Sequence, residues 1–239
     1  MTDELADRVV LITGATGGLG RVATAAFAAA GARVGLVGTD RARLATLADD
    51  LHLAGEGWVA AEADLRRADD AARAVGEISA RFGRVDVVLH LVGGWVGGTK
   101  VADVDPDDVQ GMLDQHLWTT LNIAKAVVPG MVERGWGRLM AVSATVALDG
   151  ASGMAAYAVA KAAEESLLRT LAREVAGSGV TANVLAVRKI DVDHERDTAP
   201  DPKNASWTTP EELVAAMRYL CSNEAGVVNG ARIPLTGRG

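Results

Sequence analysis

The feature that most constrains the fold is a regular alternation of short apolar runs with long, alanine-rich stretches. The apolar runs, which we interpret as β-strands, are residues 8–13, 33–38, 57–64, 84–92, 138–143, 179–187 and 231–235. The stretches with helical character between them are residues 18–31, 40–55, 67–82, 105–134, 153–176 and 208–222. Strands that are apolar on both faces and separated by helices form parallel sheets with helices on both faces. The alternation therefore predicts an α/β fold with a doubly wound parallel sheet of the Rossmann type.

No linker or internal repeat divides the chain, so its 239 residues predict a single domain over residues 1–239. One irregular polar stretch, residues 191–207, is long for a connection inside a compact domain. Because such loops usually serve function, we interpret residues 191–209 as a substrate loop.

Composition excludes several classes of partner. The net charge of −7 argues against a nucleic-acid partner, because a phosphate backbone requires a basic face. The one cysteine, Cys221, cannot form a disulfide within the chain and lies in an apolar helical run, where we expect a buried core residue. The acidic N-terminus lacks a hydrophobic signal region and no apolar run is long enough to span a bilayer, so we expect a cytoplasmic protein without a membrane partner.

A glycine-rich turn, TGATGGLG at residues 13–20, follows the first predicted strand and precedes the first predicted helix. Glycines at this place let the backbone approach a pyrophosphate, and the helix N-terminus presents N–H groups and the positive end of its dipole. A glycine cluster alone also fits a tight turn without a ligand, but this position favours a dinucleotide site. The candidate cofactor contacts in this turn are Gly14, Thr16, Gly17, Gly18, Leu19 and Gly20.

The choice of nucleotide depends on the end of the second predicted strand. An acidic residue there bonds the ribose 2′-hydroxyl of NAD, and a basic one accepts the 2′-phosphate of NADP. The stretch is Gly38-Thr39-Asp40-Arg41, and neither Gly38 nor Thr39 is charged. Asp40, which also suits the N-cap of the next helix, or Arg41 could reach the site with opposite consequences. We therefore predict NAD(P)H with Thr39 and Asp40 among its contacts, and leave the nucleotide open.

Tyr157 and Lys161 lie four residues apart in a predicted helix, so they share one face. A free tyrosine has a pKa of about 10, and a nearby ammonium lowers that pKa because it favours the phenolate. The pair therefore predicts a proton donor near neutral pH, although Tyr-x-x-x-Lys by itself is more often a solvated pair on a helix.

The TGxxxGxG motif and the later Tyr-x-x-x-Lys together resemble the short-chain dehydrogenase/reductase family over essentially the whole chain. The resemblance implies an NAD(P)-dependent oxidoreductase in which Tyr157 protonates the substrate as hydride arrives and Lys161 also holds the nicotinamide ribose. It implies a homodimer or homotetramer paired through the helix of Tyr157. Asp64 would bond the adenine, although helix capping explains this residue equally well. The resemblance implies further cofactor contacts at Asp64, Leu65, Val92, Gly93, Gly94 and Ile190.

The chain departs from the family pattern at four places near the chemistry. Ala144 stands where the family has a serine, and His116 stands where it has an asparagine. Val187-Arg188 replaces a Pro-Gly pair, and Val192 replaces a threonine that touches the carboxamide. One interpretation of these losses is a non-catalytic dinucleotide-binding homologue.

Four segments carry a narrower resemblance, to the dihydropteridine reductases, in which a small residue also replaces the serine. They are VGGWVGG (92–98), LWTT (117–120), ALDGASGMAAYAVAKAA (147–163) and SWTTPEEL (206–213). This resemblance implies that the substrate is a quinonoid dihydropterin or a related conjugated heterocycle, which has no carbonyl oxygen for a serine to polarise. Trp95 would offer a flat face to such a ring. The alternative is a carbonyl reductase of the ketone or 3-oxoacyl type that works without the serine.

The candidate substrate contacts are Trp95, His116, Ala144 and Arg188. His116 is either an additional acid or base or a packed core histidine. Arg188 either favours an anionic small-molecule substrate or simply lies on the surface. For Trp118, in the middle of a predicted helix, we favour packing. The remaining histidines, His52, His90 and His194, lack the spacing of metal ligands, so we predict no metal site.

Overall fold

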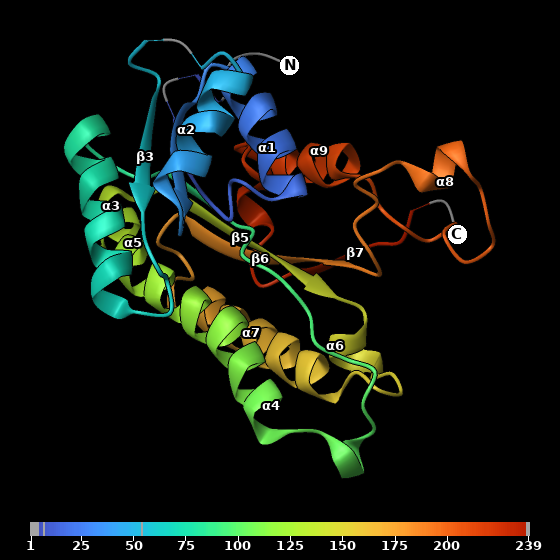
Figure 1. Cartoon of the computed structure of the whole chain (residues 1–239). Helices are drawn as coiled ribbons and strands as arrows, with labels where there is room; N and C mark the ends of the chain where they lie inside the picture. The colour runs from blue at the N-terminus through green and yellow to red at the C-terminus, as the bar shows by residue number, and fades with distance from the viewer. Residues whose placement is uncertain (1–4, 7, 54, 238–239) are drawn as a thin grey trace.

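The computed structural model describes the chain except for residues 1–4, 7, 54 and 238–239. Its centre is a seven-stranded sheet with the strand order β3-β2-β1-β4-β5-β6-β7 (Figure 1). Every pairing between these neighbours is parallel, so the predicted doubly wound α/β fold is confirmed. The strands are β1 (Val9–Thr13), β2 (Arg33–Gly38), β3 (Trp58–Glu62), β4 (Val87–His90), β5 (Gly137–Ala144), β6 (Val180–Val187) and β7 (Arg232–Leu235).

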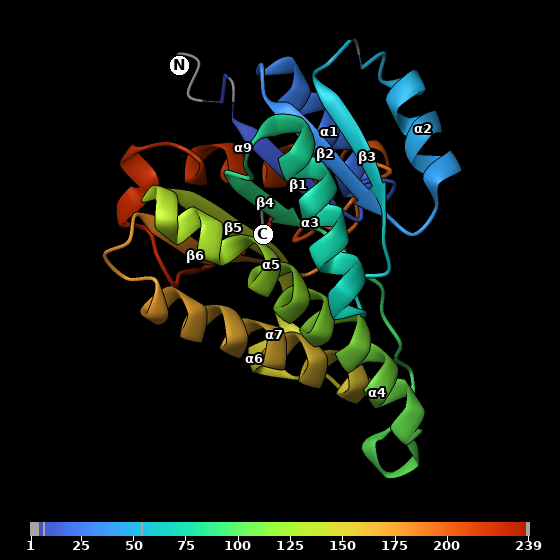
Figure 2. The same ribbon diagram turned by 90° about the vertical axis from the view of Figure 1, so that its left-hand side faces the viewer.

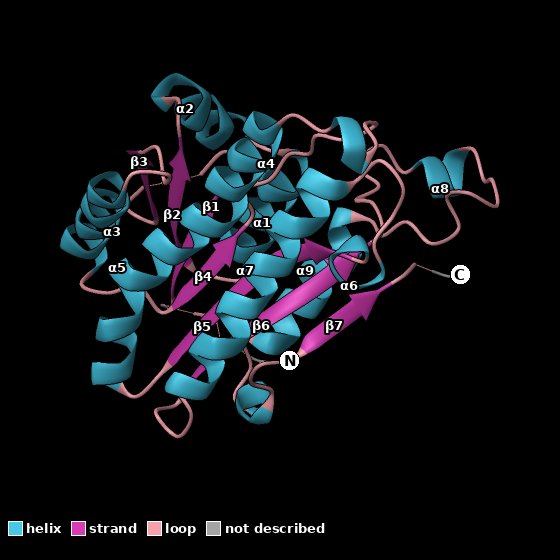
Figure 3. Ribbon diagram, turned by 90° about the horizontal axis from the view of Figure 1, so that it is seen from below, coloured by secondary structure: helices cyan, strands magenta, loops and turns pink. Residues whose placement is uncertain are grey.

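Helices cover both faces of the sheet (Figure 2 and Figure 3). The helices are α1 (Gly18–Ala29), α2 (Arg41–Asp50), α3 (Ala68–Phe82), α4 (Pro106–Leu113), α5 (Thr119–Arg134), α6 (Val146–Asp149), α7 (Ala155–Glu174), α8 (Glu195–Thr198) and α9 (Pro210–Leu220). A π-helical turn, η2 (Asp114–Trp118), and two 3₁₀ turns, η1 (Val101–Asp103) and η3 (Glu224–Val227), complete the described elements.

Two apolar clusters hold the layers together. On one face, α1 and α9 bury Phe27 and Leu213 against the sheet. On the other, α5 and α7 bury Ile123 and Leu168. All four side chains are fully buried, and each such burial stabilises the fold by about 1.5–3 kcal/mol relative to exposure.

The strand order reverses between β1 and β4, because β2 and β3 continue to one side and β5, β6 and β7 to the other. Sheets of this kind form a crevice outside the carboxyl ends of the strands at the point of reversal. Thr13 and His90, the last residues of β1 and β4, are register partners at that point. The fold therefore places the glycine turn and the residues after β4 beside one crevice.

The segment 105–134, expected as one helix, begins with Pro106 at its first position as predicted but is interrupted by η2. A π turn accommodates an extra residue and changes the direction of nearby side chains, and it often marks a functional site. The Thr119 hydroxyl donates to the carbonyl of Gln115 at 2.6 Å, and the Thr120 hydroxyl oxygen lies 2.7 Å from the carbonyl oxygen of His116.

The helix expected over residues 40–55 is shorter than predicted. It ends at Asp50, His52 has a left-handed φ of 50°, and the Leu53 N–H donates to the Ala48 carbonyl at 2.9 Å. This bond closes the helix before residue 54, which lies outside the described residues.

Two expectations about packing have opposite outcomes. Cys221 is 2% exposed, as expected for a core residue, and burial raises the pKa of its thiol to about 12. Trp118 is 45% exposed, so the packing interpretation is wrong for this residue, which lies at the end of the π turn. Among the described helices, none combines the length and apolar character needed to cross a membrane.

Candidate active site

The glycine turn between β1 and α1 suits an anionic ligand. Gly14 has a φ of 62°, and a Cβ added there would lie 2.7 Å from the Leu91 carbonyl oxygen, so the position requires glycine. Gly17 caps α1 without a side-chain hydrogen bond, and the first turn of α1 holds no acidic residue. The first N–H groups of the helix therefore remain able to bind an anion, and its dipole is not neutralised by a carboxylate. These features fit the pyrophosphate of a dinucleotide.

The start of the candidate substrate loop lies over this turn. A Cβ added at Gly18 would lie 2.8 Å from both Cγ atoms of Val192. Ile190 forms a parallel bridge with Thr208, and the Asp191 N–H donates to the Thr208 carbonyl at 2.8 Å. Backbone pairing therefore holds residues 190–192 beside the glycine turn.

A hollow of about 280 Å³ lies beyond the ends of β2 and β3 and is lined by Thr39, Arg41, Glu62, Ala63, Asp64, Asp70 and Arg73. Asp64 accepts a charge-assisted hydrogen bond from Arg66 at 2.7 Å, and this bond lowers the pKa of the carboxyl group. The N-cap of α3 is Arg67, so the helix-capping interpretation of Asp64 is wrong. Asn122 fixes this loop by donating to the carbonyls of Leu65 and Arg66 at 2.9 and 3.1 Å.

The two charged residues after β2 have different surroundings. Asp40 caps α2, as predicted, with its Oδ1 accepting from the Arg43 N–H at 3.1 Å. The Arg41 side chain is 60% exposed, and its Nε lies 3.8 Å from Oε2 of Glu62. The carboxylate is thus committed to the helix, while the guanidinium is loosely held at the edge of the hollow.

The loop after β4, residues 92–98, packs against the turn that precedes α7. The Gly98 N–H donates to the Gly153 carbonyl at 2.7 Å, and Thr99 bridges to Met154. A Cβ added at Gly97 would lie 2.5 Å from the Trp95 ring and 3.0 Å from the Gly153 carbonyl oxygen. The glycines in residues 92–98 and in the turn before α7 therefore allow these two segments to pack closely against each other.

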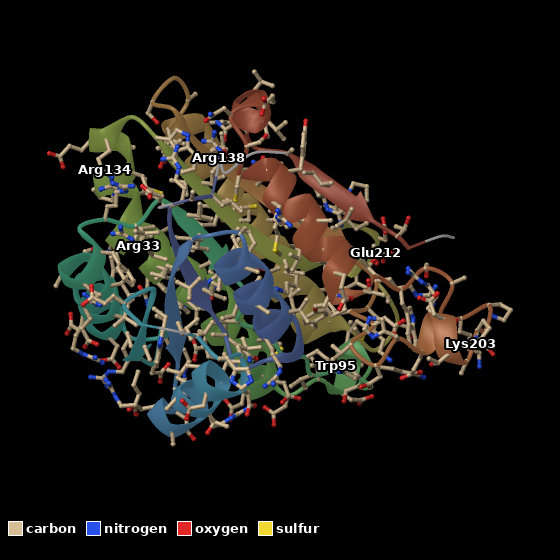
Figure 4. The ribbon with its side chains drawn as sticks, turned by 90° about the horizontal axis from the view of Figure 1, so that it is seen from above. Arg33, Trp95, Arg134, Arg138, Lys203 and Glu212 are labelled. Carbon is tan, nitrogen blue, oxygen red and sulfur yellow. The ribbon has the colours of Figure 1, made fainter. Side chains whose placement is uncertain are left out.

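Trp95 itself is 63% exposed and lies at the outer edge of the molecule, whereas Arg138 lies toward the opposite end (Figure 4). The π turn η2 holds the loop of residues 92–98 through two contacts. Gln115 Nε2 donates to the Gly93 carbonyl at 3.0 Å, and His116 Nε2 lies 3.0 Å from the Gly94 carbonyl. The predicted contacts Gly93 and Gly94 are thus fixed beside His116.

Tyr157, Lys161 and Glu164 form one stripe along α7. Lys161 is buried, and its Nζ donates at 2.8 Å to the carbonyl of Val142 on β5 and at 2.8 Å to Oε2 of Glu164. Thr120 donates to the other carboxylate oxygen of Glu164 at 2.9 Å. An ammonium has three N–H donors, so one remains for another ligand.

The expected lowering of the Tyr157 pKa is wrong. Burial raises the pKa of Tyr157 to about 12, and the negative charge of Glu164 acts in the same direction. The pKa of Glu164 is itself raised by burial, against the opposing effects of Lys161 and Thr120. Lys161 does not act on Tyr157 as an isolated positive charge, because Glu164 lies directly against it.

His116 is buried within η2 beside Tyr157. Because its Nε2 faces a carbonyl, Nε2 carries the proton and Nδ1 is an acceptor. Nδ1 is buried and has no hydrogen-bond partner among the described residues. Burial, followed by the charge of Lys161, lowers the pKa of His116 to about 3, so the imidazole is neutral at physiological pH.

His90, the last residue of β4, links three elements. Its Nδ1 lies 3.0 Å from the Thr13 hydroxyl on β1, and its Nε2 lies 3.1 Å from the Thr119 hydroxyl on α5. Thr13 also accepts from the Leu91 N–H at 3.1 Å. His90 therefore braces the end of the sheet, and complete burial lowers its pKa to about 3.

Ala144 ends β5 and is buried, and no hydroxyl is available at its side chain. Its carbonyl accepts from Arg232 Nη2 at 3.2 Å, and Arg232 also pairs with Glu165 at 3.0 Å. Arg188 is exposed and bonds Ser206 at 3.3 Å, in agreement with the surface interpretation.

The candidate substrate loop is held in place by Arg196, a buried arginine. Arg196 donates to Glu212 at 2.7 and 3.0 Å and to the Trp207 carbonyl at 2.6 Å. Lys189 lies 3.5 Å above the centroid of the Trp207 ring.

Across the described residues, no group of three or more histidine, cysteine or acidic side chains is arranged to hold a metal ion.

Sequence reasoning missed Glu164, Thr120 and Arg196. Glu164 had a signal, because it lies three residues after Lys161 and seven after Tyr157, on the same helical face. Thr120 and Arg196 had none, since their partners come from other elements.

Comparisons with known proteins agree with this geometry. Residues 8–203 match the family described as short chain dehydrogenase. The 3-oxoacyl-(acyl-carrier-protein) reductase of Salmonella typhimurium is 27% identical over 238 residues, covering 96% of each protein. The acetoacetyl-CoA reductase of Cupriavidus necator is 29% identical over 244 residues, covering 98% of each. A solved short chain dehydrogenase from Bacillus anthracis has a TM-score of 0.85 and 26% identity, covering 99% of this chain and 97% of that one.

The two curated relatives are named for 3-oxoacyl and acetoacetyl substrates, so they give the narrower resemblance to dihydropteridine reductases no support. The family match extends over most of the chain and includes both the glycine turn and the Tyr157–Lys161 pair. The protein is therefore a member of the short-chain dehydrogenase family and an NAD(P)-dependent oxidoreductase.

Proposed function

We propose that this protein reduces the carbonyl group of a small molecule with NADPH, using Tyr157 as the proton donor and Lys161 as its partner. The observation that carries the proposal is the placement of both side chains on one face of α7, with Lys161 bonded to Val142 near the end of β5. That end of the sheet also carries the glycine turn, so a bound nicotinamide and Tyr157 would share one crevice.

The roles follow from the chemistry of each group. A reduced nicotinamide supplies a hydride when bound. Tyr157 holds a proton on its phenol oxygen and donates it to the substrate oxygen, a role worth about 10²–10⁴-fold in rate. The ammonium of Lys161 is held by its hydrogen bonds to the Val142 carbonyl and to Glu164, and its third N–H can bind a ribose hydroxyl.

The carbonyl substrate is supported by the names of the relatives, which reduce 3-oxoacyl and acetoacetyl groups. A quinonoid dihydropterin is the second candidate, because two observations favour it. Ala144 provides no hydroxyl to polarise a carbonyl, and the exposed ring of Trp95 could stack on a planar heterocycle. Gly97 belongs to a segment that resembles the dihydropteridine reductases, but its packing against Trp95 and Gly153 already requires a glycine there. The presence of this glycine therefore does not by itself indicate a pterin substrate.

NADPH is favoured by the residues after β2. Asp40 caps α2 through its Oδ1 and does not line the hollow beyond β2 and β3, whereas Thr39 and Arg41 do. The exposed guanidinium of Arg41 lies beside Thr39 at the same hollow, and an arginine there suits a 2′-phosphate.

The test is NADPH and NADH oxidation with acetoacetyl-CoA, a panel of ketones and a quinonoid dihydropterin, for the wild type and Tyr157→Phe. We expect turnover of a carbonyl compound that falls by about 10²-fold or more in the variant. Turnover of the pterin alone would replace the first proposal with the second. Tight cofactor binding without turnover of any substrate would overturn both.

A homodimer or homotetramer is part of the proposal. Trp118 and Val159, on η2 and α7, are large apolar side chains about half exposed. Such exposure suits an interface between copies of this chain along the helix of Tyr157. Sedimentation analysis tests this, and a monomer at micromolar concentration would contradict it.

A further inference from the structure

The side chain of Glu164 contacts Lys161 directly and lies on the same face of α7 as Tyr157. It is 1% exposed, and both of its carboxylate oxygens are engaged. Oε2 accepts from Lys161 Nζ at 2.8 Å, and Oε1 accepts from the Thr120 hydroxyl at 2.9 Å. Burying a carboxylate is costly unless it is paired and hydrogen-bonded, and this one is held by groups from two helices.

The charge balance of this stripe matters for Tyr157. Lys161 as an ammonium and Glu164 as a carboxylate form a neutral pair, so Tyr157, on the same face of α7, does not face an uncompensated positive charge. Burial and the Glu164 charge together raise the pKa of Tyr157 to about 12.

The other titratable groups around the stripe do not supply the missing positive charge. Glu165, next along α7, is paired with Arg232 from β7 at 3.0 Å. His116 from η2 and His90 from β4 both have a pKa lowered to about 3, mainly by burial, so both are neutral.

We propose that Glu164 is a positioning residue, which anchors the Lys161 ammonium and keeps Tyr157 in its protonated form, so that the site favours proton donation over proton abstraction. This inference rests on the proposed function of Tyr157. In reduction, the phenol O–H bond breaks and the substrate oxygen gains the proton, while the carbonyl carbon receives the hydride. Oxidation of an alcohol requires the phenolate to accept that proton. Glu164 thus allows reduction to continue at higher pH, and it raises the pH at which oxidation of an alcohol begins.

The ionisation of Tyr157 can be measured without a substrate, because the chain has two tyrosines, Tyr157 and Tyr219. In a Tyr219→Phe background, the ultraviolet absorbance of tyrosinate reports Tyr157 alone. Glu164→Gln removes the charge but keeps the size of the side chain. We expect tyrosinate to appear about one pH unit lower, or more, in Glu164→Gln than in the background protein.

Two further variants separate charge from packing. Glu165→Gln is the matched control, because Glu165 is equally buried and paired but faces Arg232 rather than Lys161. Glu164→Asp keeps the charge but shortens the side chain. We expect both to titrate like the background protein. An unchanged onset in Glu164→Gln, or an equal shift in Glu165→Gln, overturns the proposal.

Glu164→Met keeps the assay decisive if Glu164→Gln does not fold. It replaces the carboxylate with an apolar side chain of similar length and so removes the charge beside Lys161, and we expect the tyrosinate onset to fall in the same direction. No fall in a folded Glu164→Met variant then overturns the proposal. Because no turnover is measured, failure here is distinct from failure of the proposed function, which shows as an unaffected rate in Tyr157→Phe.

Discussion

The imidazole of His116 meets the phenol ring of Tyr157 edge to face, with ring centroids 5.6 Å apart and ring planes at 71°. Nε2 of His116 is committed to the Gly94 carbonyl, so the bare acceptor Nδ1 is its unsatisfied atom. A buried acceptor without a partner costs about 1–3 kcal/mol, which a ligand donor would recover. His116 is thus better suited to orient a donor group than to transfer a proton.

His116→Phe tests this role, because it keeps a ring beside Tyr157 and removes both nitrogens. We expect kcat/KM to fall about 10-fold for a substrate that donates to Nδ1. Since the pKa of His116 is about 3, the pH–rate profile between about pH 5 and pH 8 should keep its shape. A limb near pH 6.5 that is present in the wild type and absent in the variant would show instead that His116 titrates.

A second prediction concerns His90 and acid stability. Its pKa is lowered to about 3 in the folded chain, whereas an unfolded histidine titrates near about pH 6.5. Between these values the unfolded state binds more protons, so the free energy of unfolding falls as pH falls. Lowering the pH from about 7.5 to about 5.5 should cost the wild type about 1.4 kcal/mol through this residue.

His90→Gln provides the comparison, because glutamine offers a donor and an acceptor but does not titrate. Urea unfolding at the two pH values should show the variant losing less stability than the wild type by that amount. Equal losses in both proteins would contradict the lowered pKa. His52→Gln is the control, since that exposed histidine lies at the end of α2, away from the sheet core.

The fold was readable from the sequence because a buried parallel sheet imposes a long-range alternation that a single chain displays. Asp40 and the Tyr157–Lys161 pair were also readable, since capping and helical spacing are local. The π turn that brings His116 into the site has no comparable signal, because one extra residue shifts the apolar pattern at a single point within a segment that is otherwise helical on both sides.

The partner of Lys161 shows where local reasoning stops. The spacing of Glu164 on α7 was visible, but its burial depends on Thr120 from α5. An exposed Glu164 would be screened by water and would affect Tyr157 little. The expected lowering of the Tyr157 pKa therefore failed through tertiary packing.

Arg41→Ala tests the nucleotide preference. Removing the guanidinium should raise KM for NADPH about 10-fold through loss of a charge-assisted hydrogen bond and leave KM for NADH nearly unchanged. Arg43→Ala is the matched control, because Arg43 is also exposed on α2 but does not line the hollow. Equal effects of Arg41→Ala on both nucleotides, or a wild type that prefers NADH, would contradict the proposal.

The last prediction concerns the glycine turn and the loop residue above it. An alanine at Gly18 places its methyl group 2.8 Å from the Val192 side chain, and also in the turn that we propose as the pyrophosphate cradle. Gly18→Ala should therefore lower both the Tm and the affinity for NADPH. We expect an affinity loss of about 10-fold or more, because overpacking costs about 1–3 kcal/mol.

Val192→Ala separates the two effects. In the double variant Gly18→Ala/Val192→Ala, the clash with the loop is relieved, so thermal unfolding should return toward the wild type. The cofactor affinity, measured by fluorescence titration, should remain weak because the methyl group still occupies the cradle. Gly76→Ala controls for the substitution itself, since a Cβ there meets no atom within 4 Å. Full recovery of affinity in the double variant would mean that Gly18 serves the packing of the loop rather than the pyrophosphate.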